Sequence, residues 1–475
     1  MKFIVTCRDG YCQGKGKKYF LKNFLILCHI LSSRWIYINR GENNPSKKKE
    51  VNCMKKVVAI LFAVLFLLGV TACQKASGPD TSPEYKFETD CQYNYRVANI
   101  NGYFTETDDS IYRIDEESYL RVIDKKTMQE TFLCAKPNCL HGQDIPESDW
   151  VVDNFECNAY VGADPSGTIC SYSGALYCII RKDRPSSPIP DFVFTEISAD
   201  GFGRKELLTL SFGQDEEADF GLPNFFIHRG IVYFSSSLYR TDEETGEQVD
   251  LGDRIYTYDL TTKKVKKIYA KERSAGTLLS NVYALGNYLY GIFMKDGELD
   301  SSLWKFNLST QESTYLDYGN RILPVGDKLL SYHFDFEMTG EKKEWDHWVE
   351  ISDLNGENRE VYPVLNFNDH PQWAKVIQSD GKYVFVTDSA YSDMTTEIRV
   401  YDFVSGEKIA SLPLPDGMGY IGDRAMSCTQ DGKLLAYSHL PFNEKGELLD
   451  MAIFYCDIST IGTPDFQWFE VEKVN

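Results

Sequence analysis

The chain has 475 residues, with 50 basic and 70 acidic side chains and a formal net charge of −20. Aromatic residues make up 14% of it, including 30 Tyr and 28 Phe. Both residue types favour strands, so the composition predicts an all-β protein. Non-specific nucleic-acid binding is excluded, because contacts to phosphate depend on clustered Lys and Arg and this chain is strongly acidic.

Residues 54–72 read MKKVVAILFAVLFLLGVTA and have the order of a secretory signal peptide. Lys55 and Lys56 form its basic head, and an apolar run extends from there to Val70. Cys73 follows directly, which resembles the lipobox that lipoprotein signal peptidase cuts. This resemblance implies a diacylglycerol on Cys73, which would anchor the mature chain to the extracytoplasmic face of the cell membrane.

Residues 1–53 precede this signal, and we interpret them as a leader that arises from a start codon placed too far upstream. The Lys-Glu-Val at 49–51 can be encoded by a ribosome-binding sequence at a normal distance from Met54. The alternative is a membrane segment over residues 20–38, although Lys22 and other polar residues interrupt it.

Removal of the signal makes the mature chain more acidic. Positions 1–72 hold 13 basic and 3 acidic residues, so 37 basic and 67 acidic residues remain and the net charge becomes −30. Anionic lipids and wall polymers would repel such a chain. Residues 73–83, which read CQKASGPDTSP, predict a short lipidated tether because Gly, Pro and Ser are typical of flexible linkers.

From residue 84 to residue 475, one unit repeats seven times. One half of the unit is a strand, a turn containing Asp, Asn, Gly or Ser, and a second strand. Its copies begin at Val122, Glu196, Thr257, Lys305, Glu350, Val400 and Phe454. The other half is a hairpin with a Gly-containing turn that precedes each copy. The first of these hairpins is VANINGYFTE, from Val97, and the second is CSYSGALYCII, from Cys170.

Two hairpins per unit give four strands, and four-stranded units at a period of roughly 45 to 75 residues predict the blades of a β-propeller. We expect seven blades, with six or eight as alternatives because unit boundaries are hard to set. A pair of β-sandwiches would not repeat its turn chemistry, and the rungs of a β-solenoid are shorter. Ring closure is expected to place Tyr85–Thr89 beside an outer strand at Trp468–Val474, or to rely on side-chain packing alone.

These turns and the DGK hairpins resemble those of TolB-like propellers and of uncharacterised propeller lipoproteins from Gram-positive, clostridial bacteria. The resemblance covers most of residues 84–475. It implies a binding platform, because the propeller ring is the only part of those proteins that these residues match.

Between the first two units, an insert at 134–157 contains Cys134, Cys139, His141 and Cys157 in the spacing C-x4-C-x-H-x15-C. Four thiolate and imidazole ligands suit tetrahedral zinc, so a structural zinc ion is one interpretation. One or two disulfides, favoured by export, are a second, and unlinked thiols in an anaerobe are a third. The insert is also similar to a Cys/His insert of clostridial propeller lipoproteins.

We expect the remaining cysteines to be buried and to act as small hydrophobic residues in the core. Cys170 and Cys178 flank the turn Ser173-Gly174; a two-residue loop would leave them one position out of register, whereas a three-residue loop would pair them. We expect the same buried role for Cys91, Cys428 and Cys456.

Functionally, the sequence predicts a binding or scaffolding module for a protein, peptide or glycan rather than an enzyme. Trp345, His347 and Trp348 lie in a long insertion of the fifth unit and are candidate ligand contacts, since aromatic faces stack on sugars and peptides. No catalytic residue is predicted. One alternative is a glycan hydrolase or lyase with two acidic residues about 5 to 9 Å apart. Another is a metal-responsive sensor that uses the Cys/His insert.

Overall fold

The structure of the protein is a computed structural model. It describes residues 86, 88–92, 104–115, 117–139, 141, 157–162, 168–184, 187–212, 218–221, 223–242, 245, 247–272, 278–294, 301–317, 321–325, 328–339, 342–361, 373–389, 397–415, 426–437 and 452–474. The chain divides into two compact units, 1–79 and 80–475, and all described residues belong to the second. The predicted leader, signal peptide, Cys73 and tether lie outside them. Within the described ranges, no helix has the length and apolar character needed to cross a membrane.

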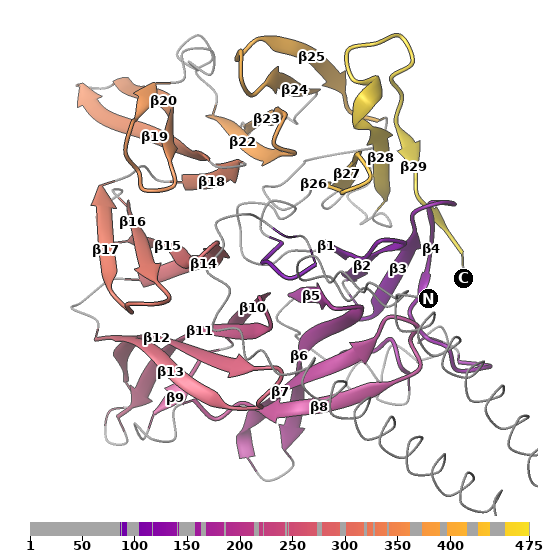
Figure 1. Ribbon diagram of the computed structural model, residues 1–475, viewed down its shortest axis with the longest axis vertical. Helices are drawn as coiled ribbons and strands as arrows, with labels where there is room; N and C mark the ends of the chain where they lie inside the picture. The colour runs from indigo at the N-terminus through magenta and orange to yellow at the C-terminus, as the bar shows by residue number, and fades with distance from the viewer. Residues whose placement is uncertain are drawn as a thin grey trace, which may run out of the picture. The chain divides into compact units, whose positions relative to one another are not determined.

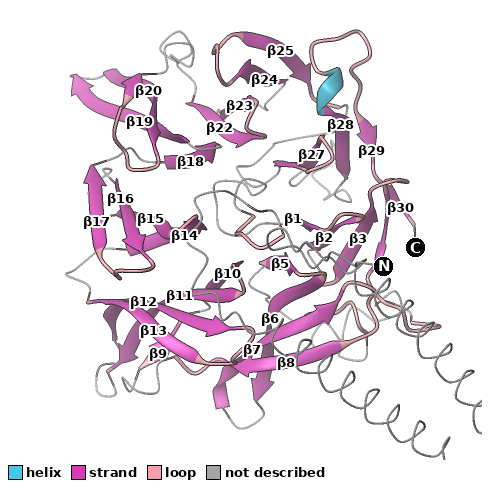
Figure 2. Ribbon diagram, viewed as in Figure 1, coloured by secondary structure: helices cyan, strands magenta, loops and turns pink. Residues whose placement is uncertain are grey.

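Seven antiparallel sheets of four consecutive strands, blades 1 to 7, are arranged in a ring, with the first strand of each nearest the centre (Figures 1 and 2). Blade 1 contains β1 (Phe104–Glu106), β2 (Ser110–Ile114), β3 (Leu120–Asp124) and β4 (Gln129–Phe132). Blade 2 contains β5 (Ile169–Tyr172), β6 (Ala175–Arg184), β7 (Ser187–Ser198) and β8 (Arg204–Thr209). Blade 3 contains β10 (Asn224–His228), β11 (Ile231–Thr241), β12 (Gln248–Asp259) and β13 (Val265–Lys271).

Blade 4 contains β14 (Leu278–Leu285), β15 (Tyr288–Met294), β16 (Ser301–Asn307) and β17 (Ser313–Asp317). Blade 5 contains β18 (Arg321–Val325), β19 (Lys328–Thr339), β20 (Lys342–Asp353) and β21 (Glu360–Val361). Blade 6 contains β22 (Trp373–Ser379), β23 (Tyr383–Ser389), β24 (Glu397–Asp402) and β25 (Lys408–Pro413). Blade 7 contains β26 (Met426–Cys428), β27 (Lys433–Tyr437), β28 (Ile453–Asp457), the short helix η6 (Ile458–Thr460) and β29 (Phe469–Glu470). The predicted seven-bladed propeller is confirmed.

The turn between the third and fourth strands follows one hydrogen-bonding pattern, which explains why the repeat is visible in the sequence. In blade 6, Oδ1 of Asp402 accepts hydrogen bonds from the backbone N–H groups of Val404, at 3.0 Å, and Ser405, at 2.8 Å. The equivalent side chains that accept from following N–H groups are Asp124, Asp259, Asn307, Asp353 and Asp457. Asp and Asn recur because their short side chains close this turn.

The first blade begins later than we predicted. The sequence predicted a hairpin across Asn101-Gly102, with Phe104 in its second strand. Instead, Phe104–Glu106 forms the innermost strand, β1, which pairs with β2 across the turn at 107–109. Asp108 and Asp109 supply the turn, and the following SIYRI segment is the apolar partner that β1 needs. The inner hairpins of the other six blades lie where predicted.

Ring closure also differs from the prediction, which involved Tyr85–Thr89. The predicted outer strand at the C-terminus is two short strands, β29 in blade 7 and β30 (Glu472–Lys473). β30 runs parallel to β4 and adds a fifth strand to blade 1. The backbone N–H groups of Glu472 and Val474 donate to the carbonyl oxygens of Met128 and Glu130, at 3.2 and 2.8 Å. The C-terminus therefore closes the ring on its first blade. Blade 3 carries an extra strand as well, β9 (Asp219–Phe220), which pairs with β11.

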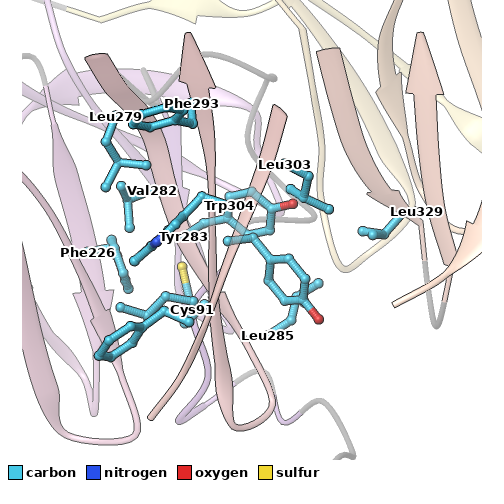
Figure 3. Packing of buried hydrophobic residues seen from close by; sticks show 14 of the residues in the cluster. Cys91, Phe226, Leu279, Val282, Tyr283, Leu285, Phe293, Leu303, Trp304 and Leu329 are labelled. Carbon is cyan, nitrogen blue, oxygen red and sulfur yellow. The ribbon is translucent and has the colours of Figure 1, made fainter. Parts of the chain in front are cut away.

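The core lies between neighbouring blades and holds them face to face. One cluster of buried side chains joins blades 3 to 6 and includes Trp304, which is fully buried against Tyr269 and Phe306 (Figure 3). Other clusters join blade 1 to blade 2, blade 2 to blade 3, and blades 6 and 7 to blade 1. Aromatic rings fill much of this volume, which accounts for the high Tyr and Phe content of the sequence.

Residues 86 and 88–92, which we call the inner clasp, bind to the inner turns of several blades. Asp90 forms a two-bonded ion pair with Arg229, at 2.8 and 3.0 Å, and their side chains are 1% and 8% exposed. The Cys91 backbone N–H donates to Nδ1 of His228, at 3.0 Å, and Nε2 of His228 lies 2.7 Å from the Gly286 carbonyl oxygen. The clasp therefore links the start of the described chain to blades 3 and 4.

The turn carboxylates should make the stability of the fold decrease as the pH falls into the acid range. Hydrogen bonds from the backbone N–H and the hydroxyl of Ser405 lower the pKa of Asp402. Because the folded pKa is the lower one, the stabilisation is present above the unfolded value of about 3.9 and is lost as the pH falls through the folded value. We expect Asp402→Asn to flatten the decline of the thermal unfolding midpoint below pH 4. Asn307→Asp, which adds a carboxylate at the equivalent turn, should steepen it; identical acid profiles would contradict the argument.

Because the ion pair between Asp90 and Arg229 in the inner clasp is buried, we expect the loss of one partner to lower the stability of the fold strongly. Arg229→Met leaves the Asp90 carboxylate buried without this partner, which should lower the free energy of unfolding by about 3–5 kcal/mol. The double variant Asp90→Asn/Arg229→Met removes both charges and should recover part of that loss. Equilibrium unfolding in urea measures both values. Equal destabilisation by the single and double variants would show that the buried charge is not the cause.

Candidate metal centre

Cys134, Cys139, His141 and Cys157 come together beside the outer strands of blades 1 and 2, as their spacing predicted. Their potential ligand atoms, three sulfurs and one ring nitrogen, all lie within 4.8 Å of one another. Nδ1 of His141 is 3.5 Å from Sγ of Cys157. Tetrahedral zinc, with Zn–S near 2.3 Å and Zn–N near 2.0 Å, places neighbouring sulfur and nitrogen ligands about 3.5 Å apart. The cluster therefore fits a metal ion with four protein ligands.

The first three ligands follow strand β4 in a tight loop. The Leu133 backbone N–H donates to the Leu120 carbonyl at 2.9 Å, which keeps the chain on blade 1 up to Cys134. Asn138 and His141 both have left-handed φ values, 60° and 49°, so the chain turns back twice within eight residues. The imidazole of His141 stacks on Phe132, with ring centroids 4.4 Å apart.

The fourth ligand, Cys157, is held by a separate short segment. The Leu120 N–H donates to the Ala159 carbonyl at 2.7 Å, and Val161 N–H to the Ser118 carbonyl at 2.9 Å. Cys157 is 1% exposed, whereas the other three ligands are partly buried. Both ligand segments are thus anchored to blade 1.

Blade 2 supplies two residues that sequence reasoning missed. A Cβ on Gly201, which has φ +74°, would lie only 3.0 Å from the Leu133 carbonyl oxygen. A glycine therefore allows the turn before β8 to pack directly on the backbone that leads to Cys134. Arg204 donates to the Asn158 carbonyl at 2.7 Å and to the Tyr160 carbonyl. Neither residue lies near the ligands in sequence, and no local motif marks them.

The surroundings shift the pKa values of three residues of the cluster in different directions. Burial and the nearby Arg121 lower the pKa of His141, which keeps its imidazole neutral. Burial raises the pKa of Cys157 to about 12. Burial also acts against ionisation of Cys134, but hydrogen bonds from the backbone N–H groups of Lys136 and Asn158 and from the side chains of Cys139 and Cys157 together outweigh it, and its pKa is lowered. Bound metal would stabilise the thiolates, because metal binding and deprotonation are coupled.

Four protein ligands complete a tetrahedron, and such closed sites have structural roles. The Cys/His cluster could bind a metal, and its position would fasten the loop after blade 1 to the segment that leads into blade 2. No disulfide joins the described cysteines.

The predicted ligand contacts lie in a strand of blade 5. Trp345, His347 and Trp348 lie in strand β20 rather than in a loop, opposite Phe336, Phe334 and His333 of β19. Their side chains lie outside the described part of the structure, and so does Cys73. The lipidation and ligand-contact roles therefore remain predictions.

The first hairpin in blade 2 has a two-residue turn, the alternative that leaves its two cysteines out of register. Cys170 lies opposite Tyr177, and Cys178 lies opposite Ile169. The two thiols pack on different sides of the blade, Cys170 toward blade 3 and Cys178 toward blade 1. They serve as small hydrophobic residues in the core, as do the buried Cys91, Cys428 and Cys456.

No family model and no curated protein matches the chain. Among solved structures, an oligogalacturonate lyase in complex with manganese is similar, with 12% identity and a TM-score of 0.38 over 66% of this chain and 77% of the other. The β-propeller domain of the trilobed protease from Pyrococcus furiosus matches with 14% identity and a TM-score of 0.37, over 64% and 93%. The acylaminoacyl peptidase of Pyrococcus horikoshii matches with 13% identity and a TM-score of 0.37, over 64% and 45%. No activity is inferred from these likenesses.

The cluster predicts one zinc ion per chain in protein prepared under reducing, anaerobic conditions. Cys139→Ser removes one of three thiolates and should abolish stoichiometric zinc, measured by elemental analysis of the purified protein. Cys170→Ala, which removes a buried thiol outside the cluster, should leave the metal content unchanged. Metal-free wild-type protein in which Cys134, Cys139 and Cys157 oxidise in air would instead establish a disulfide loop.

Proposed function

We propose that the mature chain is a lipid-anchored propeller on the extracytoplasmic face of the cell membrane, and that it serves as a binding module for a protein, peptide or glycan. The anchor rests on the signal peptide at 54–72, on Cys73 and on the resemblance to propeller lipoproteins of Gram-positive bacteria. The binding role rests on how the connections between strands are distributed around the ring.

Connections of very different length lie at the two ends of the blades, and this contrast carries the proposal. In each blade, the turns after the first and third strands contain two to six residues, except for 458–468 in blade 7. The connections after the second and fourth strands range from two residues, at 185–186 and 340–341, to 15 residues at 438–452 and 36 residues at 133–168. Long connections on a rigid scaffold are where binding residues concentrate. We call the first set the short-turn end and the second set the long-loop end.

The candidate ligand contacts are compatible with this assignment. β20 begins at the long-loop end, so the backbone places Trp345 and His347 in the half of the strand nearer to it and Trp348 directly after the midpoint. Zinc on Cys134, Cys139, His141 and Cys157 would brace the connection between blades 1 and 2 and would leave no ligand position for a substrate. The proposed metal thus supports a platform rather than a catalytic centre.

Binding is tested with the mature protein in detergent, immobilised and exposed to basic peptides, acidic peptides of equal length and neutral oligosaccharides. We expect saturable binding of one probe class, and loss of that binding when residues 438–452 are replaced by a short Gly-containing turn. Shortening the turn at 458–468 at the opposite end is the matched control and should preserve binding. Release of a cleaved product from an oligosaccharide would contradict the binding role and indicate a glycan hydrolase or lyase.

The anchor is tested by expressing the full chain in a host that processes lipoproteins. The wild-type protein should partition into the detergent phase, and mass spectrometry should find diacylglycerol on Cys73. Cys73→Ser should move the protein into the aqueous phase. A wild-type N-terminus without lipid would contradict the anchor while leaving the binding proposal to its own test.

A further inference from the structure

We infer that the ring stands on the membrane in a fixed orientation, with its short-turn end toward the lipid and its long-loop end facing away. This inference rests on the proposed anchor at Cys73 and adds which surface of the propeller meets the membrane. Two independent observations support it: the place where the chain enters the ring, and the distribution of charge between the two ends.

The chain enters the ring at the short-turn end. Arg229 lies in the turn between the first two strands of blade 3 and contacts the inner clasp directly. Gly286 lies in the equivalent turn of blade 4, and its carbonyl oxygen is 2.7 Å from Nε2 of His228, whose Nδ1 accepts from the Cys91 backbone N–H. On the other side, Nε2 of Gln92 donates to Oγ of Ser171 at 3.0 Å, and its Oε1 accepts from Oγ1 of Thr105 at 3.0 Å. These two residues lie next to the equivalent turns of blades 2 and 1. Blades 1, 2 and 3 thus bind the clasp directly at this end, and blade 4 is linked to it through His228.

Burial along the clasp shows which way the chain leaves the protein. Asp90, Cys91 and Gln92 are buried, Thr89 is half-buried, and Glu88 and Lys86 are exposed. The backbone N–H of Arg229, at the tip of its turn, donates to the Thr89 carbonyl. The chain therefore reaches solvent beside the turns, on the short-turn side of the ring.

The distance back to the lipid is short. From Cys73 to Lys86 there are 13 residues, which span at most about 45 Å when fully extended. Because the clasp fixes one end of this tether and the lipid fixes the other, the short-turn end is the part of the ring that the anchor holds near the membrane.

Charge favours the same orientation. The connections at the long-loop end, with β9 included and 133–168 left aside, contain 23 acidic and 4 basic residues. Those at the short-turn end, with the turn carboxylates Asp124, Asp259, Asp353, Asp402 and Asp457 included, contain 15 acidic and 7 basic residues. An anionic lipid surface would repel the first end much more strongly than the second, within roughly one Debye length, about 8 Å at physiological salt. The ring would therefore turn its more acidic end away from the lipid.

This orientation presents the long-loop end, with its proposed ligand contacts, to the cell exterior. A partner would reach this end without competing with the membrane. The acidic connections there would favour a cationic or neutral partner over an anionic one.

The test uses the lipidated full-length protein in vesicles of phosphatidylcholine and phosphatidylglycerol that carry a headgroup energy-transfer acceptor. A donor dye is attached to Asp108→Cys at the short-turn end or to Glu247→Cys at the long-loop end. Both positions are exposed, and both changes remove one carboxylate. We expect energy transfer to be at least twice as efficient from position 108. Equal transfer, or stronger transfer from position 247, would overturn the orientation.

Two controls separate this result from failure of the anchor. If wild-type protein does not float with the vesicles, the anchor proposal fails and the orientation is withdrawn with it. If it floats but the two dyes report equal transfer, the anchor stands and only the orientation fails. Asp90→Asn/Arg229→Gln loosens the clasp without leaving a charge buried alone, and it should reduce the difference between the dyes while the protein still floats. An undiminished difference in this variant would show that the clasp does not set the orientation.

Discussion

The structure depends on the contact between neighbouring blades, because a four-stranded sheet cannot bury both of its faces alone. Each blade finds its core only against the next one, so the seven sheets are stable as a ring and not as separate units. Large aromatic residues fill these interfaces, and Trp304 of blade 4 is the largest fully buried side chain among the described residues. A closed ring leaves no blade without a neighbour on either side. Closure is therefore the constraint that the two chain ends must satisfy, and each end meets it differently.

The C-terminus closes the outside of the ring, and the inner clasp holds the inside. β30 contributes a two-residue parallel pair with β4, which is a small interface for sealing a ring. The side chains of blades 6, 7 and 1 add a continuous buried cluster around it, with Ile111, Met426 and Val471 among its members. The clasp works by polar contacts instead, through Asp90 and Arg229. Apolar packing thus holds the blades together, and a buried ion pair fixes the segment that leads toward the proposed anchor.

Much of the architecture could be predicted from the sequence because it is encoded locally. The type of turn that contains Asp402 places the hydrogen-bond acceptor and its donors within four residues. Each copy of the turn can therefore be recognised from its own sequence, without knowing which other strands pack beside it. The ligands Cys134, Cys139 and His141 are equally local, and their spacing predicted the cluster. Gly201 and Arg204 could not be found in this way, since they approach the cluster from another blade. Asp90 and Arg229 are 139 residues apart in sequence, and nothing in the local sequence around either residue indicates which residue it pairs with. The first hairpin was predicted too early in the chain because a Gly-containing turn was expected, whereas the turn at 107–109 between β1 and β2 contains no Gly.

The strand that closes the ring also has a consequence for the order of folding. A chain is made from its N-terminus, so blade 1 can pair its four strands long before residues 472–473 exist. Until then, the outer edge of β4 has no strand beside it, and such an edge is a template for pairing with other chains. β4 is only four residues long, QETF, and a charged residue, Glu130, stands in it. A short, polar edge is a poor template for aggregation. Blade 1 can therefore remain without β30 until the C-terminal residues have been synthesised, with little risk that β4 pairs with another chain.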